Sequence, residues 1–223
     1  MRVGELRSGP CTIGIPVRNV PAAWNVLAPD VLDVFERLPR ERFAPEAWRN
    51  AAYGDFPIPL GDGQHMLRPS VAGRLLQSTA PRPGDRVLEI GTGSGYLTAC
   101  LALLATQVTS LEIRSGLARR ARENLQSAGI GNAEVEEADA YAWDGGTARF
   151  DVVILTGSMP SYDARFEKLL RPGGRLLAIV GEEPVMEAVL VRLDSAGQRS
   201  SHGLFETVVE PLTHALPVPA FSF

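Results

Sequence analysis

Residues 87–97 read VLEIGTGSGYL, and this stretch decides the fold. An apolar run ends in an acid and an isoleucine, and glycines follow at every second position as Gly91, Gly93 and Gly95. Glycine has no Cβ and tolerates positive φ, so a ligand can approach the backbone of such a turn closely. The stretch therefore predicts a strand, a ligand-binding turn and a helix that begins near Tyr96.

Strand and helix patterns alternate from residue 85 to residue 181, which predicts a doubly wound, mostly parallel sheet with right-handed crossovers. Two further strand patterns joined by a turn, 187–194 and 202–212, predict an antiparallel C-terminal hairpin. Together these patterns predict a seven-stranded, Rossmann-like α/β sheet. Its other strands are expected at 85–90, 107–113, 133–139, 150–157 and 175–181, and its helices at 96–105, 116–129 and 163–170.

The N-terminal part of the chain has a different pattern. Apolar residues at helical spacing predict a helix over 25–40, with Pro29 at the start of its stronger part, and residues 70–79 also look helical. Between them, residues 51–69 are rich in Gly, Pro and Asp, which favours an irregular but ordered wrap that acts as a lid. We therefore expect residues 1–80 to form a helical and lid extension that packs on a core of residues 81–223.

Composition restricts the class of protein. The 223 residues are 45% apolar and 22% charged, with a net charge of −4, which is typical of a globular domain and makes nucleic acid an unlikely partner. Cys11 and Cys100 lack metal-ligand spacing, so we expect neither a metal nor a disulfide. With no apolar stretch of about 20 residues and no signal-peptide pattern, the chain is predicted to be cytoplasmic. No sequence feature predicts the oligomeric state.

An acid at the end of the second strand narrows the choice of ligand. Glu112 lies 21 residues after Gly91, where a carboxylate can accept hydrogen bonds from the ribose hydroxyls of an adenosine. NAD and S-adenosylmethionine (SAM) both satisfy this requirement, so a nicotinamide oxidoreductase remains an alternative.

Three features favour SAM. The glycines follow a G-x-G-x-G spacing, whereas the dinucleotide fingerprint requires G-x-G-x-x-G and would place its third glycine at Tyr96. Asp139 ends the third strand, where it can accept the adenine amino group beside the small Ala140. The turn LRPGGRL (170–176), followed by a strand and a hairpin, fits the sheet of a methyltransferase. The predicted cofactor-binding residues are Met66, Leu67, Glu89, Gly91, Thr92, Gly93, Gly95, Glu112, Ile113, Asp139 and Ala140.

With these motifs, the chain resembles the protein L-isoaspartyl O-methyltransferase family over residues 31–213. The glycine turn is shared by SAM methyltransferases in general, but LPRERFAP (38–45) and AAYGDFPIPLGDGQ (51–64) are specific to the family. The other matching segments are GDRVLEIGTGSGYLTA (84–99), VTSLEI (108–113), FDVVILTG (150–157), LLRPGGRLLAIVG (169–181) and EPLT (210–213). The resemblance implies methyl transfer to isoaspartyl carboxylates of proteins or peptides, which starts protein repair.

The chain departs from the family pattern mainly on the acceptor side. The family usually carries Thr-Ile-Ser-x-Pro after GDGQ, with a serine at the reacting carboxylate, and here Leu67 stands at that position. Ala138-Asp139-Ala140 replaces Gly-Asp-Gly, and TGSMPSYDARF (156–166) replaces an alanine-rich stretch. The chain therefore resembles a divergent member of the family that lacks the usual serine, and the sequence does not identify its catalytic residue.

The expected chemistry needs no general base, because a carboxylic acid with a pKa of roughly 4 is already ionised at neutral pH. The acceptor still needs hydrogen-bond donors, for which His65 and Arg68 are candidates, together with the substrate-binding hydroxyls of Thr156 and Ser158. Two alternatives remain within this reading: a different carboxylate acceptor such as peptide aspartate, or a protein that binds SAM without turnover. For Glu89 there are also two roles, a contact to the SAM amino group through water or a bond to backbone amides of the turn.

Overall fold

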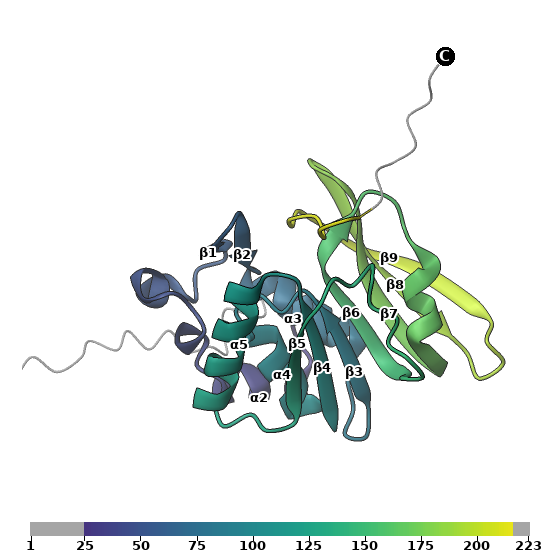
Figure 1. The fold of residues 1–223 in the computed structure, drawn as a ribbon, viewed down its shortest axis with the longest axis horizontal. Helices are drawn as coiled ribbons and strands as arrows, with labels where there is room; N and C mark the ends of the chain where they lie inside the picture. Colours follow the sequence, from purple (N-terminus) through teal and green to yellow (C-terminus); the bar gives the residue numbers. More distant parts are fainter. Residues whose placement is uncertain (1–24, 216–223) are drawn as a thin grey trace, which may run out of the picture.

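The computed structural model describes residues 25–215, so the predictions for Cys11 and for residues 1–20 lie outside the described residues. A seven-stranded sheet has the order β5-β4-β3-β6-β7-β8-β9, in which the first five strands are parallel and the last two are antiparallel (Figure 1). This confirms the predicted fold class. The strands are β3 (Arg86–Ile90), β4 (Gln107–Glu112), β5 (Ala133–Glu137), β6 (Phe150–Met159), β7 (Leu170–Glu182), β8 (Val185–Leu193) and β9 (Arg199–Thr207).

Alternate residues of the strands supply two apolar cores, one on each face of the sheet. Val87, Val108 and Val152 pack with residues of all four described α-helices, whereas Leu88 and Val153 pack on the opposite face. That second face is covered by the 3₁₀ helix η3 (Ala164–Leu169) and by residues of the segment 138–148. The α-helices are α2 (Pro29–Arg37), α3 (Pro69–Thr79), α4 (Tyr96–Leu104) and α5 (Ser115–Ser127).

Helix α2 is shorter than the predicted helix over 25–40, and prolines explain both of its ends. Ala28 and Leu38 are extended, with ψ of 119° and 98°, and each directly precedes a proline. A residue before proline is driven out of the α region by the proline ring, so the helix begins at Pro29 and ends at Arg37. The chain then continues in the 3₁₀ helices η1 (Arg40–Arg42) and η2 (Glu46–Ala51).

The wrap over 51–69 is more regular than predicted. It contains an antiparallel hairpin of β1 (Ile58–Gly61) and β2 (Gln64–Met66), joined through Asp62 and Gly63 at φ values of 53° and 69°. Asp-Gly between two short apolar segments is the sequence signal for such a turn, and the composition-based prediction overlooked it. The helix predicted over 163–170 is a 3₁₀ helix, η3, over Ala164–Leu169. Strand β7 begins at Leu170, five residues before the predicted strand.

The β1–β2 hairpin and the segment after β9 lie at the same end of the strands of the large sheet, near the top of the molecule in Figure 1. Backbone hydrogen bonds between Ser158 and residues 210 and 212 tie that final segment to β6. The extension and the core share one apolar core, while the division at residue 80 stays a prediction.

Candidate functional site

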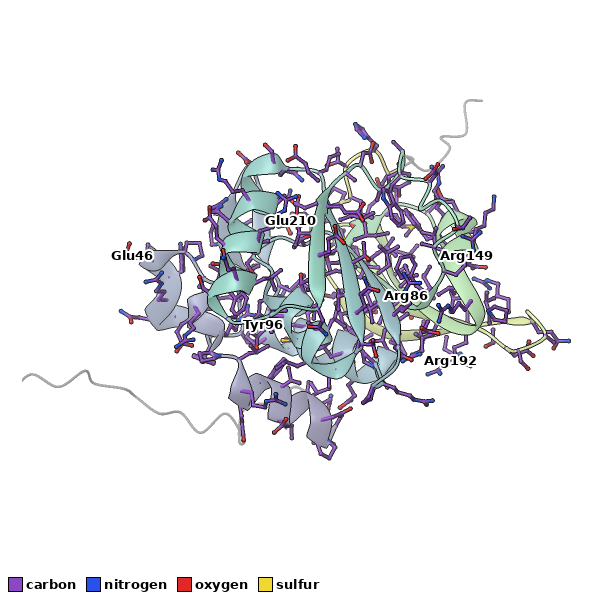
Figure 2. All side chains as sticks on the ribbon, turned by 60° about the horizontal axis from the view of Figure 1, so that its bottom comes forward. Glu46, Arg86, Tyr96, Arg149, Arg192 and Glu210 are labelled. Atoms are coloured by element: carbon purple, nitrogen blue, oxygen red, sulfur yellow. The ribbon has the colours of Figure 1, made fainter. Side chains whose placement is uncertain are left out.

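An open cleft lies beyond the carboxyl ends of β3, β4, β5 and β6. The hairpin, the turn after β3 and the segment after β9 form its walls, and Figure 2 shows two of its residues, Tyr96 and Glu210, in the central part of the molecule. Most of the residues predicted for the cofactor line this cleft, namely Met66, Leu67, Glu89, Gly91, Thr92, Gly93, Glu112, Ile113, Asp139 and Ala140.

The three positions of the turn require glycine for different structural reasons. Gly91 has φ of 97°, and a Cβ there would lie 2.3 Å from the Oγ1 of Thr156. Gly93 has φ of 56° and faces the cleft beside the hairpin residue Leu60. Gly95 does not line the cleft: a Cβ there would meet Ala121 of α5 at 3.3 Å, so this glycine serves the packing of α4 on α5.

Glu112 holds the glycine turn in place. Its carboxylate accepts hydrogen bonds from the backbone N–H of Gly93 at 2.9 Å and from that of Arg114 at 3.0 Å. The side chain is only 5% exposed and lines the cleft. Each carboxylate oxygen carries two lone pairs, so Glu112 retains acceptor capacity for a pair of ligand hydroxyls.

Glu89 is fully buried at the inner end of the cleft. Its Oε2 accepts hydrogen bonds from the hydroxyls of Thr98 and Ser110, and Ser110 continues the chain to Thr92. The role predicted as a bond to backbone amides of the turn is therefore wrong, because Glu112 performs it. Burial raises the pKa of Glu89 to about 7, with a further rise from the charge of Glu112 and an opposing effect of the two hydroxyls.

One oxygen of Glu89 has no partner in the described part of the chain. Its Oε1 is buried and accepts no hydrogen bond. A buried polar atom left unsatisfied is costly, so its presence at a cleft points to a group that a ligand supplies. This atom fits the predicted SAM, whose amino group is a hydrogen-bond donor with positive charge.

Asp139 is already paired on both of its oxygens. It accepts from the backbone N–H of Tyr141 at 2.9 Å, and it lies 2.7 Å from Nδ1 of His214. Burial acts to raise the pKa of Asp139, but the Tyr141 and His214 hydrogen bonds and the charges of His214 and Arg165 outweigh it, and the pKa is lowered. The segment after β9 therefore reaches over the end of the cleft where adenine is expected.

The acceptor candidates are divided between two clefts. A second cleft adjoins the first, and Arg68 and Ser158 line only this one. His65 lines both, and its Nδ1 lies 2.5 Å from Oε1 of Glu210. Thr156 lies on the first cleft, where its hydroxyl donates to the carbonyls of Gly91 and Ile90, so it supports the turn and does not face the second cleft.

Several residues of the first cleft were not predicted from the sequence, of which Arg40 is the most informative. It is only 2% exposed, its Nε donates to the Ala52 carbonyl, and its Nη2 donates to the Leu67 carbonyl. Its guanidinium also lies 4.9 Å from the ring centre of Tyr96. Arg40 belongs to the family-specific stretch LPRERFAP, which was the available signal. Within residues 25–215 there is no group of metal-ligating side chains.

Comparisons with known proteins agree with this geometry. The model of the family described as protein-L-isoaspartate(D-aspartate) O-methyltransferase matches residues 18–215. The chain belongs to this family. One relative, protein-L-isoaspartate O-methyltransferase 2 of Marinobacter nauticus, is 39% identical over 78% of the chain and 80% of its own length. Another, from Anaeromyxobacter dehalogenans, is 40% identical over 84% and 90%.

Solved structures show the same fold. A candidate protein-L-isoaspartate O-methyltransferase from Plasmodium falciparum, in complex with S-adenosyl-L-homocysteine, has a TM-score of 0.78 at 20% identity. The match covers 88% of this chain and 96% of that one. The family membership confirms the predicted recognition and makes the chain a SAM-dependent methyltransferase by class.

Leu67, which stands at the position predicted for the family serine, lines both clefts. Leu67 is partly buried. Its side chain packs against two apolar clusters, the main core that contains Met66 and a smaller one that contains Met186 and Val209. Its side chain donates no hydrogen bond, whereas its carbonyl anchors Arg40. None of the described helices is long and apolar enough to cross a membrane.

Proposed function

We propose that this protein transfers the methyl group of SAM to a carboxylate of a protein or peptide, with L-isoaspartyl residues as the acceptor. The observation that carries the proposal is that the two clefts meet. They share a wall of His65, Met66, Leu67, Glu210 and Pro211, so a ligand in the first cleft would lie beside an acceptor in the second.

The first cleft supplies what the cofactor requires. When bound, SAM supplies an electrophilic methyl group on a sulfonium ion. Glu112 and Asp139 offer carboxylates at neighbouring strand ends, and Glu89 offers a buried acceptor without a partner. Gly91 and Gly93 bring bare backbone against the cleft.

Arg68 supplies a positive charge for the acceptor in the second cleft, which Glu182, Glu183 and Glu210 also line. Arg68 is partly buried, and its guanidinium makes no hydrogen bond or ion pair with the other residues between 25 and 215. His65, by contrast, is engaged with Glu210. A guanidinium presents two parallel N–H donors that match a carboxylate, so Arg68 is the better of the two candidates for holding the acceptor.

The catalytic effect then comes from alignment, which can lower a barrier by roughly 7–11 kcal/mol at best. The ionised acceptor needs no proton removed, and Met66 and Leu67 place apolar side chains where the two clefts meet. Apolar side chains there would limit the access of water to the reacting atoms. We propose a cytoplasmic location for this reaction on the basis of the low cysteine content.

A second acceptor is favoured by one observation. Leu67 removes the hydroxyl that the family pattern places at the reacting carboxylate, which suits a drift to an ordinary aspartyl carboxylate. Incubation with methyl-labelled SAM and matched peptides that contain isoaspartate, aspartate or asparagine separates the two. Label on the isoaspartyl peptide supports the proposal, label on the aspartyl peptide supports the alternative acceptor, and label on neither contradicts both.

The role of Arg68 is tested in the same assay. Arg68→Met should raise KM for the labelled peptide by about tenfold, because it removes a charged hydrogen bond. Arg192→Met is a matched control, since Arg192 is exposed on β8 and lines neither cleft. Equal behaviour of the two variants would show that Arg68 does not hold the acceptor.

A further inference from the structure

Arg40 is a buried cation with a free hydrogen-bonding site. Its side chain is among the largest fully buried ones, and its Nη1 has no hydrogen-bond partner among the described residues 25–215. The other two nitrogens donate to the carbonyls of Ala52 and Leu67, which are neutral. Burial lowers the pKa of Arg40, with opposing contributions from Tyr96, Cys100, Tyr53 and Asp55.

No carboxylate forms an ion pair with Arg40 within the described residues 25–215. A guanidinium buried without a counter-charge is strongly destabilising unless another group supplies it. The residue lines the first cleft, so a ligand in the cleft is in a position to supply that charge. An anionic oxygen is the group that satisfies both the free N–H donor and the positive charge.

Glu89, which lines the same cleft, lacks a hydrogen-bond donor for one of its carboxylate oxygens among the residues that the structure describes. It is a buried acid whose Oε1 lacks a donor, and both it and Arg40 line the cleft beside Tyr96. The cleft thus contains one unsatisfied buried donor with positive charge and one unsatisfied buried acceptor of acidic type. A group that carries a carboxylate and an ammonium on the same carbon satisfies both, and this is the α-amino-acid group.

We propose that Arg40 binds the α-carboxylate of the amino-acid portion of SAM, while Glu89 receives its α-ammonium group. The inference rests on the proposed function, because it takes SAM as the ligand of the first cleft. Arg40 also donates to the Leu67 carbonyl, so the residue that binds this carboxylate is the one that anchors the hairpin between the two clefts. Binding of the cofactor and placement of the acceptor wall therefore depend on the same side chain.

The test compares two ligands that differ only in the carboxylate, SAM and decarboxylated SAM, by isothermal titration calorimetry. Wild-type protein should bind SAM about tenfold or more tightly than the decarboxylated ligand. Arg40→Gln should lose that factor for SAM and leave the affinity for decarboxylated SAM nearly unchanged. Arg42→Gln should behave as wild type, since Arg42 lies in the same 3₁₀ helix, is exposed and does not line the first cleft.

Two results would overturn the inference and leave the proposed function intact. Equal loss of affinity for both ligands in Arg40→Gln would assign Arg40 a structural role alone. Equal affinity of wild-type protein for both ligands would show that the carboxylate is not recognised, and the cofactor assignment itself would stand. Failure of wild-type protein to bind SAM at all would instead contradict the proposed function together with this inference.

A second measurement does not depend on a variant that folds. A crystal structure of the wild-type protein with S-adenosylhomocysteine should place a carboxylate oxygen within hydrogen-bond distance of Nη1 of Arg40. A carboxylate bound elsewhere, with Nη1 still unpaired, would overturn the inference.

Arg40→Lys keeps the charge and should retain part of the preference for SAM, which separates loss of charge from loss of packing.

Discussion

The backbone carbonyl of Leu67 accepts a hydrogen bond from the buried guanidinium of Arg40. The position where the family pattern expects a serine is thus held by its main chain, and its side chain is free to differ without loss of the hairpin. This relationship explains how the chain can keep the family fold and the wall between two clefts while its acceptor side diverges.

Leu67→Ser should therefore fold and should raise the rate of methyl transfer to an isoaspartyl peptide, because the new hydroxyl can donate a hydrogen bond at the boundary of the clefts. The loss of apolar packing should cost about 1–3 kcal/mol of unfolding free energy. Initial rates with labelled SAM measure the first effect and urea denaturation the second. Leu67→Ala is the control, and equal rates in the two variants would show that the hydroxyl has no part in the reaction.

Glu112→Gln should weaken cofactor binding by about tenfold, since one carboxylate both orients the Gly93 amide and is predicted to accept the ribose hydroxyls. Glu137→Gln is a matched control, because Glu137 pairs with Glu112 across β4 and β5 but is exposed and outside the cleft. Calorimetric titration with S-adenosylhomocysteine gives both values. A similar affinity in both variants would place the nucleoside elsewhere.

Gly91→Ala should destabilise the protein by about 2 kcal/mol or more, because alanine at a φ of 97° is strained and its Cβ would lie 2.3 Å from the Oγ1 of Thr156. Gly116→Ala, in α5, meets no atom within 4 Å and should stabilise the protein by about 0.5–1 kcal/mol. Denaturant unfolding of the two variants checks both signs. A neutral Gly91→Ala would contradict the close approach of β6 to the turn.

The raised pKa of Glu89 predicts a pH dependence. Its pKa is about 7 in the folded protein and near 4.5 when unperturbed, so the unfolded chain ionises first as pH rises. The contribution of Glu89 to stability is therefore fully present below pH 4.5 and is lost as pH rises through 7, by an amount on the order of a few kcal/mol. Glu89→Gln should remove this slope in urea unfolding of the ligand-free protein.

Cofactor binding should show the opposite trend, because an ammonium group favours the ionised carboxylate of Glu89. The affinity for S-adenosylhomocysteine should rise as pH increases through 7 in the wild-type protein, and this rise should be smaller in Glu89→Gln. An identical pH profile in both proteins would mean that Glu89 does not receive the amino group.

Local patterns in the chain predicted the class of fold and most of the cofactor cleft. Short stretches of sequence encode the apolar β-strands, the helices after them and the Gly91–Gly93 turn. The carboxyl ends of parallel strands meet at one edge of the sheet, so residues at those ends could be predicted to lie together. The errors also had local causes, as the prolines that end α2 and the Asp62-Gly63 turn show.

The remaining features depend on contacts between segments far apart in the chain. The sequence alone determined that three strand ends would carry the glycine turn, Glu112 and Asp139. Only the tertiary structure decided that Arg40 is buried against Leu67 and that His65 lies on Glu210, 145 residues away. Burial and the lack of a partner are properties of packing, and no periodicity in the sequence encodes which polar atom is left unsatisfied.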